Sequence, residues 1–376
     1  MPQASPQPSL GDLRDDQILA LLRSGAHAAL MSAYFGEAEY RELCHLAKLA
    51  ATRRNPRGRR VFVLPGIMGS RIGSTRGRSY SLLWLHPAAI ANGSLLRLAM
   101  PGPRSIRAVG VMLPGYLKLR LSLEIAGFRP LFFPFDWRLD LTQLARSLTR
   151  AIEASGERRA LVVGHSMGGL VARAALGNAR IGRLVQLGAP NDGSFAPVQA
   201  FRAVYPTVRK IAALDRSHTA EELARTVFRT LPGLYQMLPS AETSAEPDLF
   251  DARAWPEDDL VPDAAMLTRA RRVRSRLPAA DDRCSVIVGT NQETITSVAR
   301  RDGGFEYALR PEGDGTVPLS RAQWADAATW FVNENHGALT QNDAVIGAVI
   351  DILKSGTTKR LASQPPRPNG TVTRCV

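Results

Sequence analysis

Short apolar runs alternate with amphipathic stretches through most of the chain, beginning near residue 60. The apolar runs are rich in valine, isoleucine and leucine, which is typical of buried strands. Strands are predicted at Val61–Leu64, from Arg129 onward, and at Leu161–Val163, Ile181–Leu187, Ser285–Gly289 and Phe305–Leu309. Helical spacing predicts helices at Tyr116–Ile125, Leu139–Ala154 and Leu170–Leu176. This alternation favours an α/β fold with a mostly parallel sheet, right-handed crossovers and helices on both faces.

Three regions depart from this rhythm and define the predicted domain organisation. Residues 1–59 read as an N-terminal helical appendage followed by an arginine-rich linker. Residues 60–360 form the α/β domain, and residues 361–376 read as a disordered tail. An insertion at about 195–280 carries several prolines and aromatics and interrupts the strand–helix order. We expect this insertion to be a lid or cap over a site, and a permanently packed subdomain is equally compatible with its composition.

The stretch Gly164-His165-Ser166-Met167-Gly168 has the pattern G-x-S-x-G and lies between a predicted strand and a predicted helix. In a nucleophile elbow the serine stands on a sharp strand-to-helix turn that exposes its hydroxyl. Glycines flank it because a side chain would block the close approach of strand and helix. The alternative is an ordinary glycine-rich turn. The context on both sides favours Ser166 as a catalytic nucleophile.

The first apolar strand ends in Pro65-Gly66-Ile67-Met68-Gly69-Ser70. The loop after an early strand supplies an oxyanion-hole N–H in enzymes that carry such an elbow, and glycines let this loop bend. Taken alone, the stretch is a plain strand-ending turn. Together with Ser166 it predicts that the Ile67 N–H is an oxyanion donor.

The acid and the base of a triad follow the serine in the order Ser, Asp or Glu, His in this type of enzyme. Only His218 and His336 follow Ser166, and His218 lies in the insertion, where no late sheet loop precedes it. His336 is therefore the predicted base. Asp314 is the predicted acid because the glycines beside it let the carboxylate turn toward an imidazole.

Two other aspartates, Asp302 and Asp326, are weaker candidates for the acid because they lie in ordinary polar surroundings. A hairpin turn without catalytic function is the alternative reading of Gly313-Asp314-Gly315.

Composition limits the function classes. The chain has 376 residues, 45% hydrophobic and 22% charged, as in a globular protein, and a formal charge of +14. Its arginines are scattered rather than grouped with aromatics, so no nucleic-acid partner is predicted, whereas weak attraction to an anionic membrane is expected. Three separated cysteines support neither a disulfide framework nor a metal site. No cofactor is predicted. Without an evident signal peptide, a cytoplasmic location is expected.

Five motifs together resemble the lecithin:cholesterol acyltransferase-like family of α/β-hydrolases, which is related to lysosomal phospholipase A2. The matching stretches are Pro65–Ser70, Pro134–Arg138, Gly164–Gly169, Leu187–Pro190 and Gly313–Val317, in the family's order. The resemblance implies an α/β-hydrolase fold, a triad of Ser166, Asp314 and His336, and oxyanion amides at Ile67 and Met167.

The expected chemistry is acyl transfer through an acyl-enzyme. His336 takes the Ser166 proton while Asp314 orients the imidazole, and the amides stabilise the tetrahedral oxyanion. Hydrolysis of a lipid or other carboxylic ester is the leading prediction. Transfer of the acyl group to a lipid alcohol is the second, and an inactive lipid-binding module on the same fold is a remote third.

Overall fold

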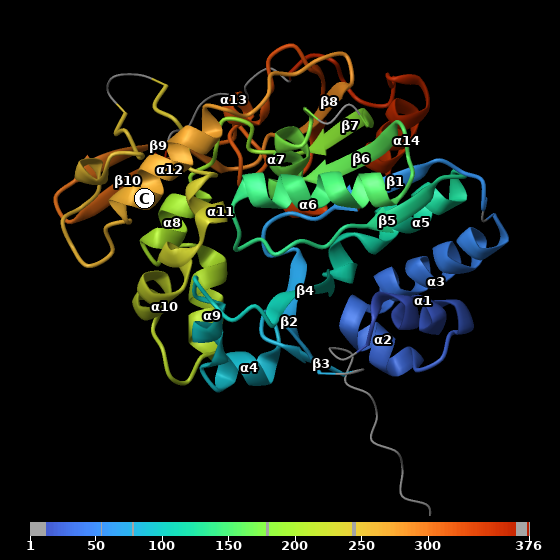
Figure 1. Cartoon of the computed structure of the whole chain (residues 1–376), viewed down its shortest axis with the longest axis horizontal. Helices are drawn as coiled ribbons and strands as arrows, with labels where there is room; N and C mark the ends of the chain where they lie inside the picture. Colours follow the sequence, from blue (N-terminus) through green and yellow to red (C-terminus); the bar gives the residue numbers. More distant parts are fainter. Residues whose placement is uncertain are drawn as a thin grey trace, which may run out of the picture.

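The computed structural model describes residues 13–53, 55–76, 79–177, 180–242, 246–365 and 374–375. Its centre is a six-stranded sheet with the order β11-β8-β7-β6-β1-β5, in which every neighbouring pair is parallel (Figure 1). The strands are β1 Arg60–Leu64, β5 Arg129–Phe132, β6 Ala160–His165, β7 Ile181–Leu187, β8 Cys284–Thr290 and β11 Ala328–Asn333. The predicted α/β-hydrolase architecture is confirmed.

Both faces of this sheet are buried, which explains why its strands are nearly continuous apolar runs. Alternate side chains enter two different cores. Phe62 and Val162 pack on one face with residues of α6 and α7. Val61 and Leu161 pack on the other face with residues of α5 and α14.

The described helices lie on the two faces of the sheet and in the N-terminal and inserted segments beside it. Their bounds are α1 Asp15–Ser24, α2 Ala28–Phe35, α3 Glu37–Thr52, α4 Pro87–Ala91, α5 Leu117–Ile125, α6 Leu141–Ala154, α7 Met167–Ala174, α8 Ala196–Phe201, α9 Pro206–Leu214, α10 Ala220–Thr226, α11 Pro232–Tyr235, α12 Ala264–Arg274, α13 Leu319–Ala322 and α14 Asp343–Ser355. Glycines follow the last residue of α1, α2 and α14, and prolines begin α4, α9 and α11.

The three N-terminal helices pack against the hydrolase domain. Leu22 and Leu43 are fully buried in the same core as α5 and α14. The guanidinium of Arg71, which is 5% exposed, donates to the Asp15 carboxylate at 2.6 Å and to the Leu13 carbonyl at 2.8 Å. The helices are therefore part of the folded unit rather than a detached module. Residues 1–12 lie outside the described chain.

Two small antiparallel sheets were not predicted from the sequence, and the strand predicted at Phe305–Leu309 lies in one of them rather than in the parallel sheet. One has the order β3-β2-β4, with β2 Ser70–Arg76, β3 Ser79–Leu82 and β4 Ile106–Val111. The other has the order β12-β10-β9, with β9 Thr294–Arg301, β10 Gly304–Arg310 and β12 Arg374–Cys375. Arg374–Cys375 thus pairs with β10, where the sequence predicted disorder from residue 361, and residues 366–373 lie outside the described chain.

The insertion at 195–280 folds into α8–α12, which lie to the left of the sheet in Figure 1. Its aromatic side chains pack against one another and belong to the same hydrophobic core as one face of the sheet. The Phe201 ring lies 4.6 Å from the Tyr235 ring and 5.9 Å from the Trp255 ring, measured between centroids. The insertion is a well-packed cap in this conformation.

Candidate active site

Ser166 lies between the last residue of β6 and the first residue of α7, as predicted. Its backbone has φ 52 and ψ −125, an unfavourable conformation for a residue with a side chain. A Cβ on Gly164 would lie 2.7 Å from the Gly168 carbonyl oxygen, and one on Gly168 would lie 2.4 Å from the Pro65 carbonyl oxygen. The flanking glycines are therefore required by the close approach of β6, α7 and the loop after β1.

His336 and Asp314 meet although they lie on different loops. His336 Nδ1 is 2.7 Å from Asp314 Oδ2, and the His336 N–H donates to the Asp314 carbonyl, also at 2.7 Å. The other carboxylate oxygen, Oδ1, accepts the N–H groups of Thr316 at 3.0 Å and Val317 at 2.7 Å. Asp314 is 1% exposed, so these bonds fix the orientation of a buried carboxylate.

A cavity of about 270 Å³ brings Ser166 and His336 to the same space. Most of its wall is apolar and comes from five regions: the loop after β1, the segment before α4, the loop after β7, the insertion and the Asp314 loop. The apolar lining residues include Ile67, Met68, Trp84, Leu85, Pro190, Ala196, Pro197, Ala200, Leu234, Met237 and Val317. This composition suits an acyl chain, with the serine hydroxyl and the imidazole as its polar end.

The rival candidates occupy other places. His218 Nδ1 lies 3.1 Å from Asp215 Oδ2 within the insertion, but His218 does not line the cavity of Ser166. Asp302 and Asp326 are exposed. Within the described chain, neither of these two aspartates contacts His336.

The Ile67 N–H has no acceptor among the described residues. The Gly69 N–H donates to the Gly66 carbonyl at 3.1 Å, and in a trans peptide the N–H of Ile67 points opposite to that carbonyl. Met167 is the first residue of α7, where backbone N–H groups have no intrahelical partner. Both amides are therefore free to donate, and Ile67 lines the cavity with Ser166.

Sequence reasoning missed two buried residues next to this cavity, Tyr116 and His165. Tyr116 Oη accepts the Gly66 N–H at 2.8 Å and lies 2.9 Å from His165 Nδ1, while His165 Nε2 lies 3.0 Å from the His336 carbonyl oxygen. His165 stands inside the G-x-S-x-G motif, so its position was visible. Tyr116 carries no local signal of its contacts, which reach across 50 and 49 residues.

The charge state of His165 and the nature of its two partners decide where the protons lie in these hydrogen bonds. Burial, and secondarily the nearby His336, lower the pKa of the His165 imidazole to about 3, so the ring is neutral at pH 7. A carbonyl oxygen only accepts, so His165 donates from Nε2 to His336. Its Nδ1 then accepts, and the Tyr116 hydroxyl donates to it. Burial also raises the pKa of Tyr116, which keeps that hydroxyl protonated.

Gly188, at the end of β7, forms the wall behind the His336–Asp314 pair. It has φ +55, and a Cβ there would lie 2.9 Å from Asp314 Oδ2 and 3.1 Å from His336 Nδ1. We expect Gly188→Ala to push the pair apart and to lower turnover on the order of 100-fold, the scale of an ångström-sized misplacement. The measurement is kcat on a soluble ester.

Gly156→Ala is the matched control for this substitution. Gly156 also has positive φ, +76, but a Cβ there meets nothing within 4 Å. Both variants carry the backbone strain of about 1–2 kcal/mol, and only Gly188→Ala crowds the pair. Equal turnover in the two variants would contradict the assigned role of Gly188.

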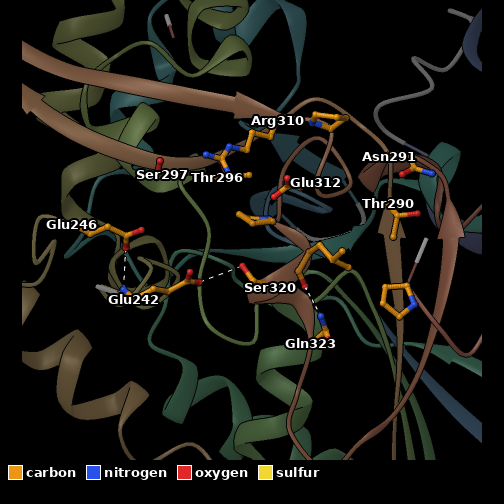
Figure 2. A pocket seen from close by; sticks show the side chains of 14 residues that line it. Glu242, Glu246, Thr290, Asn291, Thr296, Ser297, Arg310, Glu312, Ser320 and Gln323 are labelled. Carbon is orange, nitrogen blue, oxygen red and sulfur yellow. Dashed lines mark hydrogen bonds between the residues drawn. The ribbon is translucent and has the colours of Figure 1, made fainter. Parts of the chain in front are cut away.

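A second, larger cavity of about 600 Å³ is lined in part by Glu312 and Pro318, which lie on either side of Asp314 in the sequence (Figure 2). Many of its lining residues are polar, among them Glu242, Thr296, Ser297, Arg310 and Glu312. None of the described residues that line it is a histidine, and neither Ser166 nor Asp314 opens into it. Size alone therefore does not mark the reactive site, and the smaller cavity holds the nucleophile and base candidates.

No cluster of three His, Cys, Asp or Glu side chains that could hold a metal ion is found in the part of the chain that the structure describes. Over the same residues, no single helix is long and apolar enough to cross a membrane. The bent pair α1 and α2 meets those criteria only when the two are taken together.

Comparison with known proteins agrees with this architecture. The family model described as lecithin:cholesterol acyltransferase matches residues 122–294. The structure titled "The crystal structure of Tle4-Tli4 complex" is similar with a TM-score of 0.50 and 14% identity, covering 79% of this chain and 98% of that one. A lipase from Bacillus licheniformis, BlEst2 in its mature form, aligns with a TM-score of 0.43 and 13% identity over 81% of this chain and 94% of its own.

Among curated protein sequences, none matches the chain. The family match includes the elbow, β7 with Gly188 after it, and the insertion. It ends before Asp314 and His336. The predicted resemblance is confirmed: residues 122–294 match the lecithin:cholesterol acyltransferase family model, and the chain has an α/β-hydrolase fold.

Proposed function

We propose that this protein is a serine hydrolase or acyltransferase that acts on carboxylic esters of lipids. The observation that carries the proposal is one apolar cavity shared by Ser166, on a strained elbow, and His336, which is held by a buried aspartate. The family match supports an enzyme acting on lipid acyl esters.

In the proposed reaction Ser166 Oγ attacks the ester carbonyl carbon while His336 Nε2 takes the hydroxyl proton. The carboxylate of Asp314 holds the Nδ1 proton and stabilises the imidazolium. The amides of Ile67 and Met167 stabilise the oxyanion, at about 3–4 kcal/mol for each donor. His336 then passes its proton to the leaving alcohol, and an acyl-serine remains.

The acyl group then goes to water or to an alcohol. Hydrolysis is our leading proposal because it needs no second binding site for an acceptor. Transfer to a lipid alcohol is the alternative, and it uses the same acyl-enzyme.

The test distinguishes hydrolysis from transfer to an alcohol. Purified protein is incubated with chromogenic esters of several chain lengths, and then with phospholipid vesicles with and without an added long-chain alcohol. We expect release of free fatty acid. Esters of long acyl chains should be turned over faster than acetate esters, because the cavity wall is apolar. Alkyl ester formed at the expense of free acid would identify a transferase. If the wild type neither turns over any ester nor reacts with a fluorophosphonate, the proposed function is wrong.

We further propose that the protein reaches its substrate at an anionic membrane surface. Four of the five large hydrophobic side chains that are exposed in the described chain lie in two segments, residues 85–96 and residues 204–214. They are Leu85, Leu96, Val204 and Leu214. Leu85 also lines the cavity of Ser166, and α4 and α9 bring the two segments together. Exposed basic residues accompany them: Arg97, Arg209, Lys210 and Arg216.

This proposal predicts the effect of a charge placed in the apolar surface. Val204→Asp combined with Leu214→Asp is expected to weaken sedimentation with anionic vesicles at least about tenfold, because it removes apolar contact and adds repulsion. High salt is expected to weaken binding of the wild type by screening its basic residues. Leu131→Asp is the control, since Leu131 is 46% exposed on β5, outside both segments. Equal loss in the control would contradict this docking surface.

A further inference from the structure

One continuous path of hydrogen bonds connects the loops that carry the proposed catalytic groups. It runs from the Gly66 N–H to the Tyr116 hydroxyl, from that hydroxyl to His165 Nδ1, and from His165 Nε2 to the His336 carbonyl. Gly66 precedes Ile67, His165 precedes Ser166, and His336 is the proposed base. The path therefore touches the oxyanion loop, the elbow and the base loop in turn.

We propose that Tyr116 and His165 are positioning residues. They hold the oxyanion loop, the elbow and the base loop in the relative positions that turnover requires. The proposal rests on the proposed function, because it concerns how the same groups are aligned. Neither side chain opens to bulk water, with Tyr116 6% exposed and His165 7% exposed.

The bond to Gly66 acts on the oxyanion donor. The Gly66 N–H and carbonyl are both occupied, the first by Tyr116 Oη at 2.8 Å and the second by the Gly69 N–H at 3.1 Å. Together they fix the peptide planes on either side of Gly66, and the second plane contains the Ile67 N–H. A Cβ on Gly69 would lie 2.8 Å from Tyr116 Oη, so the loop packs directly on this hydroxyl.

The bond to His336 acts on the base. The backbone of His336 is held on both sides, by Asp314 through its N–H and by His165 through its carbonyl, while its ring is held by Asp314. The rings of His165 and His336 are 4.9 Å apart between centroids. A second tie joins the same region, since the Thr340 hydroxyl donates to the Gly115 carbonyl at 2.5 Å.

Tyr116→Phe tests the proposal, because it removes one hydroxyl and leaves the Gly66 N–H and His165 Nδ1 buried without partners. Turnover is measured per active site, with sites counted by fluorophosphonate titration, so that loss of folded protein does not lower the number. We expect kcat to fall about 10- to 100-fold with KM within about twofold, somewhat less than deletion of an oxyanion donor.

Tyr235→Phe is the matched control. The Tyr235 hydroxyl is also buried, accepts the Asp263 N–H at 3.1 Å and donates to the Arg229 carbonyl at 2.8 Å, but contacts none of the three loops. We expect it to lower the melting temperature by an amount similar to Tyr116→Phe while leaving kcat per site unchanged.

Variants of His165 separate its two bonds. Gln keeps an N–H near the position of imidazole Nε2 and so retains the bond to His336, but it loses the acceptor for Tyr116. His165→Gln is expected to lower kcat less than Tyr116→Phe, because it leaves the bond between Tyr116 and the Gly66 N–H in place. The double variant is expected to be no more than about twofold worse than Tyr116→Phe, which already breaks the Tyr116–His165 bond. His165→Phe loses both bonds and is expected to be the slowest of the series.

Wild-type kcat per site in Tyr116→Phe and His165→Gln, with only the melting temperature lowered, would overturn the positioning role and leave the proposed function intact. A multiplicative loss in the double variant would show that the two residues do not act through one bond. Absence of turnover and of labelling in the wild type would instead overturn the proposed function itself.

Discussion

Asp314→Asn is expected to lower kcat by about 10⁴-fold while the protein stays folded and binds ester normally. The reason lies in the two backbone N–H groups of Thr316 and Val317 that donate to Oδ1. An asparagine must turn its oxygen toward these donors, which turns its NH₂ toward His336 Nδ1. The imidazole then carries its proton on Nε2, where it cannot accept the proton of Ser166. A loss of this size is known for the same change in a serine protease triad.

The measurement is steady-state kinetics on a soluble ester, together with the rate of fluorophosphonate labelling. Asp302→Asn is the control, because Asp302 is exposed and was a weaker candidate for the acid. If Asp314→Asn retains more than about a tenth of wild-type turnover, the aspartate does not set the tautomer of the base.

Ser166→Ala and His336→Ala are each expected to abolish turnover, and the double variant is expected to be no worse than either single one. In subtilisin, removing the serine or the histidine costs about 10⁶-fold, nearly as much as removing the whole triad. The same non-additivity should hold here, since His336 is the one imidazole among the described lining residues that is paired with a carboxylate. Residual hydrolysis above the rate in water then measures the oxyanion amides and binding.

His218→Ala is the matched control for the base. His218 also has an aspartate partner, Asp215 at 3.1 Å, but lies away from the cavity of Ser166. It should retain wild-type turnover. If instead His218→Ala is inactive and His336→Ala is active, the assignment of the base is reversed.

Local pattern was sufficient for much of the fold. The valine-rich runs of β1, β6 and β8 are buried on both faces, so their composition alone predicts a strand. The elbow was recognisable because its glycines and serine stand next to each other in the sequence, although the contacts that exclude a side chain at Gly168 come from Leu64 and Pro65. The order of the remaining histidines and acids along the chain then left few candidates for a partner.

Other elements were not readable in this way. The strand β11 Ala328–Asn333, which leads to His336, was missed because it is an edge strand with mixed polarity. The β2–β4 sheet was missed because its short segments are stabilised by pairing with each other across an irregular loop. Strand tendency in such segments comes from their neighbours rather than from their own residues.

By itself, the sequence determined the strand–helix alternation, the elbow at Ser166 and the short list from which Asp314 and His336 were chosen. Only the tertiary structure decided which of the two histidine–aspartate pairs opens into the cavity of Ser166, and that Tyr116 and His165 join three loops. The reason is physical: backbone tendency and apolar period act over a few residues, whereas the His165–His336 bond joins groups 171 residues apart and depends on how the whole sheet places its loops.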